Sequence, residues 1–408
     1  MSHVISLFLL WLTLIIADIR QSCAIRSDKY GSILNIPRED RINRLYIQLN
    51  AGAGESIDRS TVNPKTMLEI ARKIMHPYKI DFRICDWWSI YQIGQRIASR
   101  FTVGERIFLA GDAVHTHSPK LAQGMNVSMQ DSYNMGWKLG SVITGVSPRS
   151  LLKTYEAERR AVALQLLKID EEIARYYSKP QPAVNGVEKK SDDFAVMRKR
   201  MGRFLAGVGV TYAHSALIAA ETECKPELAK HVILGARLPS CQLLSQSEAK
   251  PVQLHDLLKS TGQWRIIVFA GNIKDTSQQE RLERLSTNLA AKDSFIRRHT
   301  PPGRPRDSVF EIYAIHNASR TEVNLLDDFQ ELFHPWDEER GWDYYKVYVN
   351  DRPYHHVFED VYERLGIADE GCVVICRPDQ HVGYIGGLED VEQMGNYFSG
   401  ILLDFSGS

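Results

Sequence analysis

The sequence has no G-x-G-x-x-G turn opening a helix, which is the usual start of a dinucleotide-binding βαβ unit. The segment 50–54 (Asn-Ala-Gly-Ala-Gly) comes nearest, but it lacks a third glycine and a following apolar helix. A G-x-S-x-G nucleophile elbow is also absent, which excludes the common serine-hydrolase arrangement. The chemistry of this chain therefore has to be sought in other residues.

An excess of charge of either sign is missing as well. Lys+Arg and Asp+Glu number 50 each, so electrostatics give no reason to expect nucleic acid or an acidic membrane as a partner. A composition of 44% hydrophobic and 25% charged residues is that of a globular chain. Its 408 residues suffice for two or three domains.

The six cysteines include no C-x-x-C pair. Cys372 and Cys376 flank a predicted strand, where residues four apart lie about 13 Å from each other, beyond disulfide reach. Scattered cysteines of this kind predict reduced thiols and a cytoplasmic protein. His115 and His117 have no Cys or third His at ligand spacing, so no metal site is predicted.

One long apolar run is present, from Val4 to Ala17. It is shorter than the ~20 residues of a membrane-spanning helix. Its length fits the core of a signal peptide, but no Lys or Arg precedes it. A third interpretation is that residues 1–17 are foreign to the fold and come from an abnormal start, such as an unspliced segment or a truncated gene model. We favour this third interpretation, and an N-terminal signal or membrane anchor is the alternative.

Residues 107–126 are the most informative part of the chain. A short apolar run ends at Gly111-Asp112, crosses a loop containing Pro119, and enters a helix at Gly124. A carboxylate at the end of an apolar strand requires a hydrogen-bonding partner, such as a ligand hydroxyl. A helix start offers backbone N–H groups and the positive end of the helix dipole to negative charge. The pattern predicts a strand over 106–110 and a ligand site at the helix start.

The periodicity of the remaining chain predicts strands alternating with helices, and hence an α/β protein. Strands are predicted within 23–36, 44–49, 264–270, 345–349, 371–376 and 382–385, and helices over 61–75, 126–144 and from 152 to about 176. The predicted domains are an apolar segment (1–17), a substrate-binding sheet region (18–105), part of a cofactor domain with long helices (106–177), a linker or helical segment (178–225) and a C-terminal domain (226–408).

Residues 107–126 resemble the second flavin-binding motif of the FAD-dependent aromatic hydroxylases, and the neighbouring residues resemble the phenol 2-monooxygenase branch. Further matches, with structural roles, are Asp131, Asn134, Trp137, Lys138 and Leu139 in the next helix and Tyr155, Glu158 and Arg159 in the one after it. The stretch 376–385 resembles the thioredoxin-like C-terminal domain of phenol hydroxylases. The resemblance covers residues 18–408 and about the C-terminal two-thirds of a family member. It implies the α+β flavoprotein hydroxylase portion with an incomplete FAD domain, followed by a thioredoxin-like α/β domain.

The resemblance implies FAD as the cofactor. Asp112 would bind a ribityl hydroxyl, and Pro119 would shape the loop beside the flavin C4a edge. Backbone N–H groups at the helix start would stabilise the negative charge of reduced flavin. Leu121-Ala122 departs from the family pattern of small residues ending in Gly, so crowding against the flavin is expected. The implied cofactor-binding residues are Asp112, Pro119, Ala122, Gln123, Gly124, Met125 and Asn126.

A substrate site is implied by the likeness of residues 37–39 and 44–46 to the phenol-pocket lining of this branch. Tyr46 and Arg38 are the catalytic candidates, and Tyr46, Arg38 and Arg44 the substrate-binding ones. The Tyr46 hydroxyl would bond the phenolic oxygen and make the ring electron-rich. Arg38 and Arg44 would favour the phenolate. The alternative for the two arginines, that they are surface residues, stays open.

The implied activity is NADPH- and O₂-dependent hydroxylation of a phenol ortho to its hydroxyl, through a flavin C4a-hydroperoxide. The implied protein is a homodimer that takes part in the degradation of aromatic compounds. The alternative is a non-catalytic remnant that acts only as a structural or dimer partner, which the missing pyrophosphate loop favours. Whether the chain is itself an enzyme is open at this point. The expected partners are a phenolic small molecule and oxygen, with no nucleic acid, and a membrane only if the apolar start is a real signal or anchor.

Overall fold

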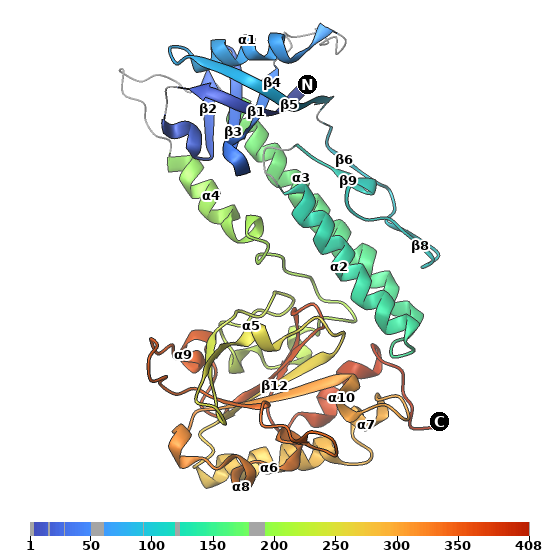
Figure 1. Cartoon of the computed structure of the whole chain (residues 1–408). Coiled ribbons are helices and arrows are strands. Elements are labelled where there is room, and N and C mark those ends of the chain that lie inside the picture. The colour runs from blue at the N-terminus through green and yellow to red at the C-terminus, as the bar shows by residue number, and fades with distance from the viewer. Residues whose placement is uncertain are drawn as a thin grey trace. The chain divides into compact units, whose positions relative to one another are not determined.

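The computed structural model describes residues 4–14, 17–27, 29–49, 61–92, 94–118, 123–178 and 192–407 (Figure 1). The chain forms two compact units, each assembled from separate stretches of sequence. The first unit comprises Met1–Ser99, Asp112–Met125 and Ala163–Met197. The second unit comprises Arg100–Gly111, Asn126–Val162 and Arg198–Ser408.

The first unit is built on a five-stranded antiparallel sheet of order β2-β3-β4-β1-β5. Its strands are β1 (Val4–Leu14), β2 (Cys23–Ser27), β3 (Gly31–Pro37), β4 (Asn43–Leu49) and β5 (Ile80–Gln92). The hairpin predicted within 23–36 and the strand predicted over 44–49 are confirmed. Two single turns of 3₁₀ helix, η1 (Ala17–Arg20) and η2 (Glu39–Arg41), connect these strands.

The position of β1 corrects the expectation that residues 1–17 are foreign to the fold. β1 lies between β4 and β5, with Leu7 opposite Tyr46 on one side and opposite Ser89 on the other. A continuous apolar run fits a strand in the middle of a sheet as well as a signal or membrane segment, and hydropathy alone does not separate them. Within the part of the chain that the structure describes, no helix has the length and apolar character needed to cross a membrane.

Helix α1 (Pro64–Met75) covers one face of this sheet (Figure 1). Asn63 caps its start by accepting from the backbone N–H groups of Lys65 and Thr66, and Pro64 takes the first helical position. The core beneath the helix is formed by Ile33, Leu45, Ile47, Met67, Ala71, Ile74, Met75 and Ile80. Because side chains alternate along a strand, the even-numbered residues of β4 point to the face opposite α1.

Short strands and long helices follow β5. β6 (Arg96–Ile97) pairs with β9 (His115–Thr116), and β7 (Thr102–Val103) pairs with β8 (Ile107–Phe108). The helices are α2 (Gly124–Ile143), α3 (Lys153–Ser178) and α4 (Asp192–Leu205), with 3₁₀ turns at η4 (Gly111–Ala113) and η6 (Arg149–Leu152). The predicted helices over 61–75, 126–144 and 152–176 are confirmed to within a few residues.

The buried strand predicted over 106–110 is wrong in two respects. Only Ile107 and Phe108 are in a strand, and Ile107 is 60% exposed. Among the described residues β8 pairs with the two-residue strand β7 alone. The apolar run therefore lacks the neighbouring strands that would bury it.

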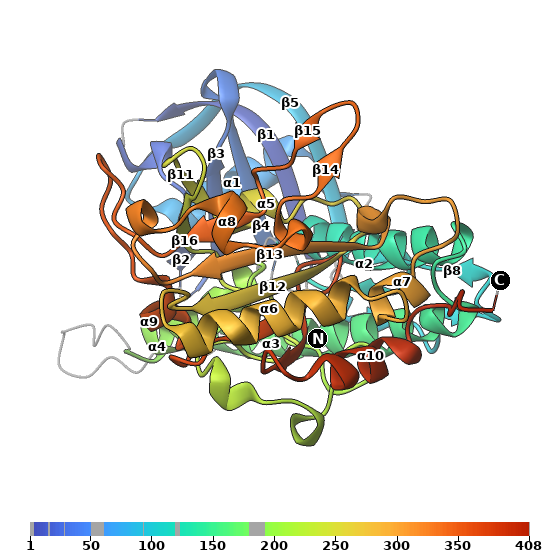
Figure 2. The same cartoon turned by 90° about the horizontal axis from the view of Figure 1, so that it is seen from below.

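The C-terminal part of the second unit contains a seven-stranded mixed sheet of order β11-β10-β16-β13-β12-β17-β18. Figure 2 shows its neighbouring strands β12 and β13 with α6 running along them. The strands are β10 (Gln242–Ser245), β11 (Pro251–Gln253), β12 (Trp264–Gly271), β13 (Phe310–His316), β16 (Val347–Val349), β17 (Cys372–Cys376) and β18 (Val382–Gly386). β12, β13 and β16 are parallel, and the other neighbours are antiparallel. The predicted strands at 264–270, 345–349, 371–376 and 382–385 are confirmed as β12, β16, β17 and β18.

Helices cover both faces of this sheet, as expected where parallel strands are buried. One face packs against α6 (Thr276–Ala290), α7 (Phe295–Arg298) and α10 (Val391–Ser399), and the other against α5 (Leu254–Leu257) and α9 (Val361–Leu365). Alternate residues of β12 supply the two cores, Ile266 and Val268 to the first and Ile267 and Phe269 to the second. This part of the chain also contains α8 (Leu325–Asp328), β14 (Trp336–Asp337) and β15 (Gly341–Trp342).

Candidate functional site

The turn that carries Asp112 begins at Gly111, whose φ is +60°. A Cβ atom at this position would lie 2.6 Å from Oγ of Ser128 in α2. The turn therefore requires glycine for two reasons, its left-handed backbone and its close approach to α2. Asp112 itself is exposed, and no hydrogen bond or ion pair engages its carboxylate among the described residues. It is available to a ligand.

Within the second unit, a buried ion pair holds Gly111 against α2 and α3. The backbone N–H of Gly111 donates to Oδ2 of Asp131 over 3.1 Å. Oδ1 of the same carboxylate accepts from Nε of Arg159 over 2.6 Å, and both side chains are almost fully buried. Tyr155 of α3 donates its hydroxyl to the carbonyl of Leu109 over 2.7 Å. The family-matching residues of α2 and α3 thus fix the segment that leads into Asp112.

The loop after the turn is anchored by Asp170 of α3, which is fully buried. One of its oxygens accepts from Nε2 of Gln95 over 2.7 Å and from the backbone N–H of Ser118 over 2.9 Å. The Ser118 hydroxyl donates to the other oxygen. The sequence offered no motif for Asp170, which acts across about 50 residues of chain, and its role was missed.

α2 begins at Gly124, directly after the buried Gln123. Met125 and Asn126 occupy its first turn and are exposed. The His117 Nδ1–H donates to the carbonyl of Ser118 over 2.8 Å, so Nε2 carries the lone pair in the neutral ring. That Nε2 is buried without a hydrogen-bond partner in the described chain, 3.6 Å from where a Cβ on Gly124 would stand. An unpartnered acceptor beside a helix start fits a ligand that donates a hydrogen bond there.

Two of the predicted cofactor residues, Pro119 and Ala122, lie outside the described residues, as do Leu121 and the segment 50–54. The other five are Asp112, Gln123, Gly124, Met125 and Asn126, which stand at the turn and at the first turn of α2.

The predicted substrate residues lie on or next to β3 and β4. Tyr46 is half-buried on the face opposite α1, opposite Leu34 of β3. Arg44 shares that face, and its Nε is buried without a hydrogen-bond partner among the described residues. Arg38 is exposed at the end of β3 and is engaged by Glu39, with 2.8 Å between Nε and Oε2. This contact lowers the pKa of Glu39. Tyr46 and Arg44 are thus brought to one face, whereas Arg38 is paired on the surface.

A second buried cluster joins α2 and α3 to the turn between β17 and β18. Both Glu158 oxygens accept from Arg377, over 2.6 and 3.0 Å, and one also accepts from Lys138 over 2.7 Å. Arg377 also pairs with Asp379 over 2.6 Å, and the Trp137 indole N–H donates to Asp379 over 3.0 Å. All four charged side chains are at most 4% exposed. Sequence analysis gave Lys138 and Glu158 structural roles but did not identify Arg377 as their partner.

Burial and ion pairing shift the pKa values of the charged residues in this cluster in opposite directions. Burial lowers the pKa of Lys138 to about 8 against the attraction of Glu158. Burial alone raises the pKa of Glu158, but Arg377 and Lys138 outweigh it and hold that pKa well below its usual range. The guanidinium of Arg377 lies 4.9 Å from the ring centre of Tyr212, whose pKa burial raises to about 12. The cluster is a fixed junction, because its carboxylates stay ionised and its tyrosine stays neutral at neutral pH.

Two family profiles match the chain over most of its length. "FAD binding domain" matches residues 4–170, and "Phenol hydroxylase, C-terminal dimerisation domain" matches residues 210–405. The first match includes β1, so the family likeness begins before residue 18. The FAD-dependent monooxygenase hkm7 of Aspergillus hancockii is 32% identical, over 93% of this chain and 67% of that protein. The chain belongs to the FAD-dependent aromatic hydroxylase family, in its phenol hydroxylase branch.

Other relatives agree with this assignment. Phenol 2-monooxygenase fsqG of Aspergillus fumigatus is 37% identical over 94% of this chain and 63% of its own length. 3-Hydroxybenzoate 4-monooxygenase of Comamonas testosteroni is 37% identical over 94% of this chain and 62% of its own length. The chain thus spans a little over three-fifths of the length of these two relatives. Their names do not favour the alternative of a non-catalytic remnant.

Solved structures share the fold of this family member. The anhydrotetracycline hydroxylase OxyS of Streptomyces rimosus has a TM-score of 0.61 and 18% identity, covering 98% of this chain and 63% of its own. The flavin-dependent monooxygenase PieE, solved with FAD and substrate, has a TM-score of 0.59 and 16% identity, with 98% and 66% coverage. The mixed α/β architecture expected from the sequence is confirmed.

Proposed function

We propose that this chain provides the substrate sheet and part of the flavin site of a monooxygenase that hydroxylates a phenolic ring ortho to its hydroxyl, with FAD, NADPH and O₂. The observation that carries the proposal is the turn at Gly111–Asp112, which leaves one carboxylate unengaged and is followed by the start of α2. Asp131 and Arg159 hold this turn in place, within a match to an FAD-binding domain. A preorganised carboxylate of this kind suits a ligand hydroxyl.

The residues present fit FAD. Asp112 would accept hydrogen bonds from the ribityl chain, and the first turn of α2 would lie next to the part of the isoalloxazine that becomes negative on reduction. His117 Nε2, the buried acceptor beside Gly124, would accept from an N–H of the same ring system. FAD, when bound, supplies the reaction with oxygen, which no side chain of this chain can supply.

Tyr46 and Arg44 would prepare the substrate. The Tyr46 hydroxyl would bond the phenolic oxygen, and the Nε–H of Arg44, which has no partner among the described residues, would favour the phenolate. An ionised phenol is more electron-rich at the ortho carbon and is hydroxylated there. Arg38 is paired with Glu39, so we propose a smaller contribution from it than from Arg44.

The C-terminal match also supports a homodimer formed through the domain of residues 210–405. We propose that this domain is thioredoxin-like in fold but structural in role, because the sequence has no redox-active cysteine pair. All six cysteines are free, and Cys241, Cys372 and Cys376 are buried.

FAD content and phenol-dependent NADPH oxidation of the purified protein test this function. Asp112→Asn removes the charge of the proposed ribityl acceptor and is expected to weaken FAD binding on the order of 10-fold. Asp86→Asn on β5, another exposed aspartate, is the matched control and leaves FAD binding unchanged. Absence of bound FAD together with NADPH oxidation that ignores phenol would overturn the proposal in favour of a non-catalytic partner.

A further inference from the structure

The C-terminal sheet has a cleft of about 890 Å³ at the edge where its parallel strands begin. Its floor is formed by residues at the starts of β12, β13 and β16, among them Arg265, Glu311 and Lys346. Ligands of open parallel sheets bind at the opposite edge, beyond the carboxyl ends of the strands. The position of this cleft is therefore not that of a usual cofactor pocket.

The charges on the floor of the cleft are already paired. Glu311 accepts from Arg265 and from Lys346, each over 2.9 Å. Lys346 also lies 3.6 Å from Asp343. Burial opposes ionisation of Glu311, but its two cations outweigh burial and hold its pKa below the usual range. The floor thus offers no spare charge to a ligand.

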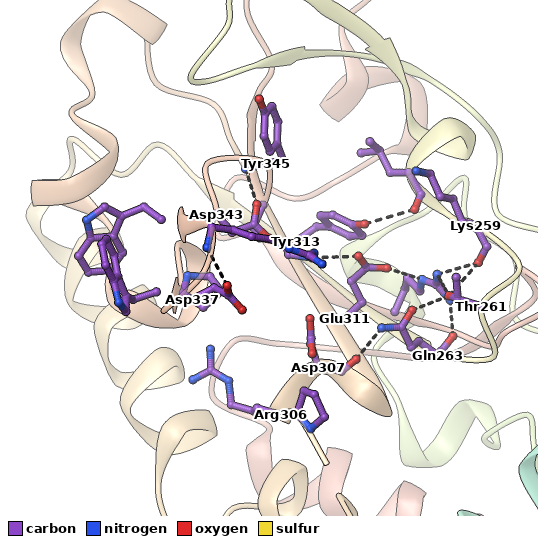
Figure 3. A pocket seen from close by; sticks show the side chains of 18 of the residues that line it. Lys259, Thr261, Gln263, Arg306, Asp307, Glu311, Tyr313, Asp337, Asp343 and Tyr345 are labelled. Atoms are coloured by element: carbon purple, nitrogen blue, oxygen red, sulfur yellow. Dashed lines mark hydrogen bonds and ion pairs between the residues drawn. The ribbon is translucent and has the colours of Figure 1, made fainter. Parts of the chain in front are cut away.

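The wall of the cleft, in contrast, carries two arginines without partners. Arg297 of α7 and Arg306 line the cleft, and no hydrogen bond or ion pair engages either guanidinium in the described part of the chain. Burial, and then the positive charge of Arg297, lower the pKa of Arg306, and the nearby carboxylates Glu331 and Asp307 oppose this shift without forming an ion pair with it. Figure 3 shows Arg306 at the cleft together with Asp307 and Asp337. Two adjacent, unpaired guanidinium groups favour an incoming carboxylate.

The other wall of the cleft is an exposed hairpin formed by β14 and β15, residues 336–342. Trp336 and Trp342 pack edge to face with ring centres 5.1 Å apart, and Trp336 is 54% exposed. Glu338 and Glu339 at the tip are exposed, do not line the cleft, and make no side-chain ion pair among the described residues. Trp, Tyr and Arg are the residues most enriched at protein interfaces, and Tyr345 beside the hairpin is 57% exposed.

We propose that the β14–β15 hairpin of one copy of this chain enters the cleft of a second copy, with Glu338 and Glu339 pairing with Arg297 and Arg306 of that copy. The surface is self-complementary, because one copy carries both the acidic tip and the pair of arginines, and a two-fold axis would form both contacts at once. The inference rests on the homodimer proposed above and names its contact surface. The mixed charge of the cleft favours a protein partner over a small anion.

Charge exchange tests this surface in the full chain. Glu338→Lys/Glu339→Lys and Arg297→Glu/Arg306→Glu each place like charges opposite one another, and each is expected to weaken the dimer on the order of 100-fold in sedimentation equilibrium. An equimolar mixture of the two variants is expected to form a heterodimer of wild-type affinity, because both contacts are then restored with reversed sign. Glu280→Lys/Glu283→Lys on the exposed side of α6 makes the same change of charge and is the matched control.

The possible outcomes separate this surface from the homodimer itself. A wild-type chain that stays monomeric at all concentrations overturns the homodimer and this surface with it. A wild-type dimer that survives both charge reversals leaves the homodimer standing and overturns the surface. Dissociation of each variant without recovery in the mixture, or dissociation of the α6 control, also overturns the pairing of hairpin and cleft. Far-ultraviolet circular dichroism of each variant checks that the fold is retained.

Discussion

At Gly111 a single residue decides whether the Asp112 turn can form. A side chain there would be strained by the left-handed backbone and would also meet Ser128 of α2. Gly104 has nearly the same φ, +58°, but nothing lies within 4 Å of where its Cβ would be. The two glycines therefore separate backbone strain from steric contact.

Gly111→Ala is expected to destabilise the protein by about 2–4 kcal/mol, from a positive φ and displacement of a packed helix. Gly104→Ala should lower the free energy of unfolding by only about 1 kcal/mol, because backbone strain from the positive φ is its sole effect. Thermal unfolding and FAD content of both variants measure the difference. Equal losses in the two variants would show that the approach to α2 is unimportant for the turn.

Tyr46 is a second residue whose role can be separated from its packing. Tyr46→Phe keeps the ring on its half-buried strand and removes only the hydroxyl. We expect phenol-stimulated NADPH oxidation to fall on the order of 100-fold while FAD content stays unchanged, because the role proposed for the hydroxyl is to bond the substrate and not the flavin. Tyr30→Phe, at an exposed turn, is the control. Full activity in Tyr46→Phe would assign the phenolic oxygen to another group.

At the scale of elements, the charged cluster joins three separate pieces of the second unit. α2 supplies Lys138, α3 supplies Glu158, and the β17–β18 turn supplies Arg377 and Asp379. Glu158 sits at the centre with two cationic partners, so its loss leaves two buried cations facing each other. Loss of Lys138 leaves Glu158 with its two-pronged contact to Arg377.

Glu158→Gln is therefore expected to cost about 3–5 kcal/mol of unfolding free energy. Lys138→Met should cost clearly less, because its long apolar side chain fills the same space and no buried charge is stranded. Urea unfolding of both variants gives the comparison, with Glu280→Gln as an exposed control that changes stability by less than about 0.5 kcal/mol. A larger loss in Lys138→Met would show that Lys138, rather than Arg377, is the main partner of Glu158.

At the scale of the whole molecule, the same cluster links stability to pH. Glu158 and Asp379 have pKa values lowered by their cations, which outweigh burial. Their contribution to the stability of the fold is complete above the ordinary carboxyl pKa values of 4.5 and 3.8. It is lost as the pH falls through the lowered pKa values of the folded state. Lys138 acts in the same direction, but at alkaline pH. Between about 8 and 10.5 the unfolded chain keeps a proton that the folded chain releases, so stability rises with pH there.

Calorimetry of the full chain should therefore show that the unfolding temperature of the second unit falls steeply below about pH 4. The free energy of unfolding should decrease by on the order of 2 kcal/mol between pH 4 and pH 3. Glu158→Gln should flatten this acid branch, whereas Lys138→Met should weaken it less, because Arg377 remains, and should remove the alkaline rise. An acid branch identical in wild type and Glu158→Gln would mean that other carboxylates control acid unfolding.

Much of the architecture follows from local sequence patterns. The 3.6-residue period of 61–75 and the capping Asn63 determine α1, and alternation determines the 23–36 hairpin. The turn at Gly111–Asp112 could also be located, because glycine, a carboxylate and a helix start form a local pattern. These features depend on neighbours in the chain, which a sequence displays directly.

Only the tertiary structure decided the features that depend on distant partners. The apolar run Val4–Leu14 became a strand because β4 and β5 flank it, and 107–110 was left largely exposed because β8 pairs with β7 alone among the described residues. Asp170 and Arg377 received their roles from groups about 50 to 220 residues away. Hydropathy and spacing show which residues a segment can bury. The fold decides which hydrogen-bond and charge partners that segment meets.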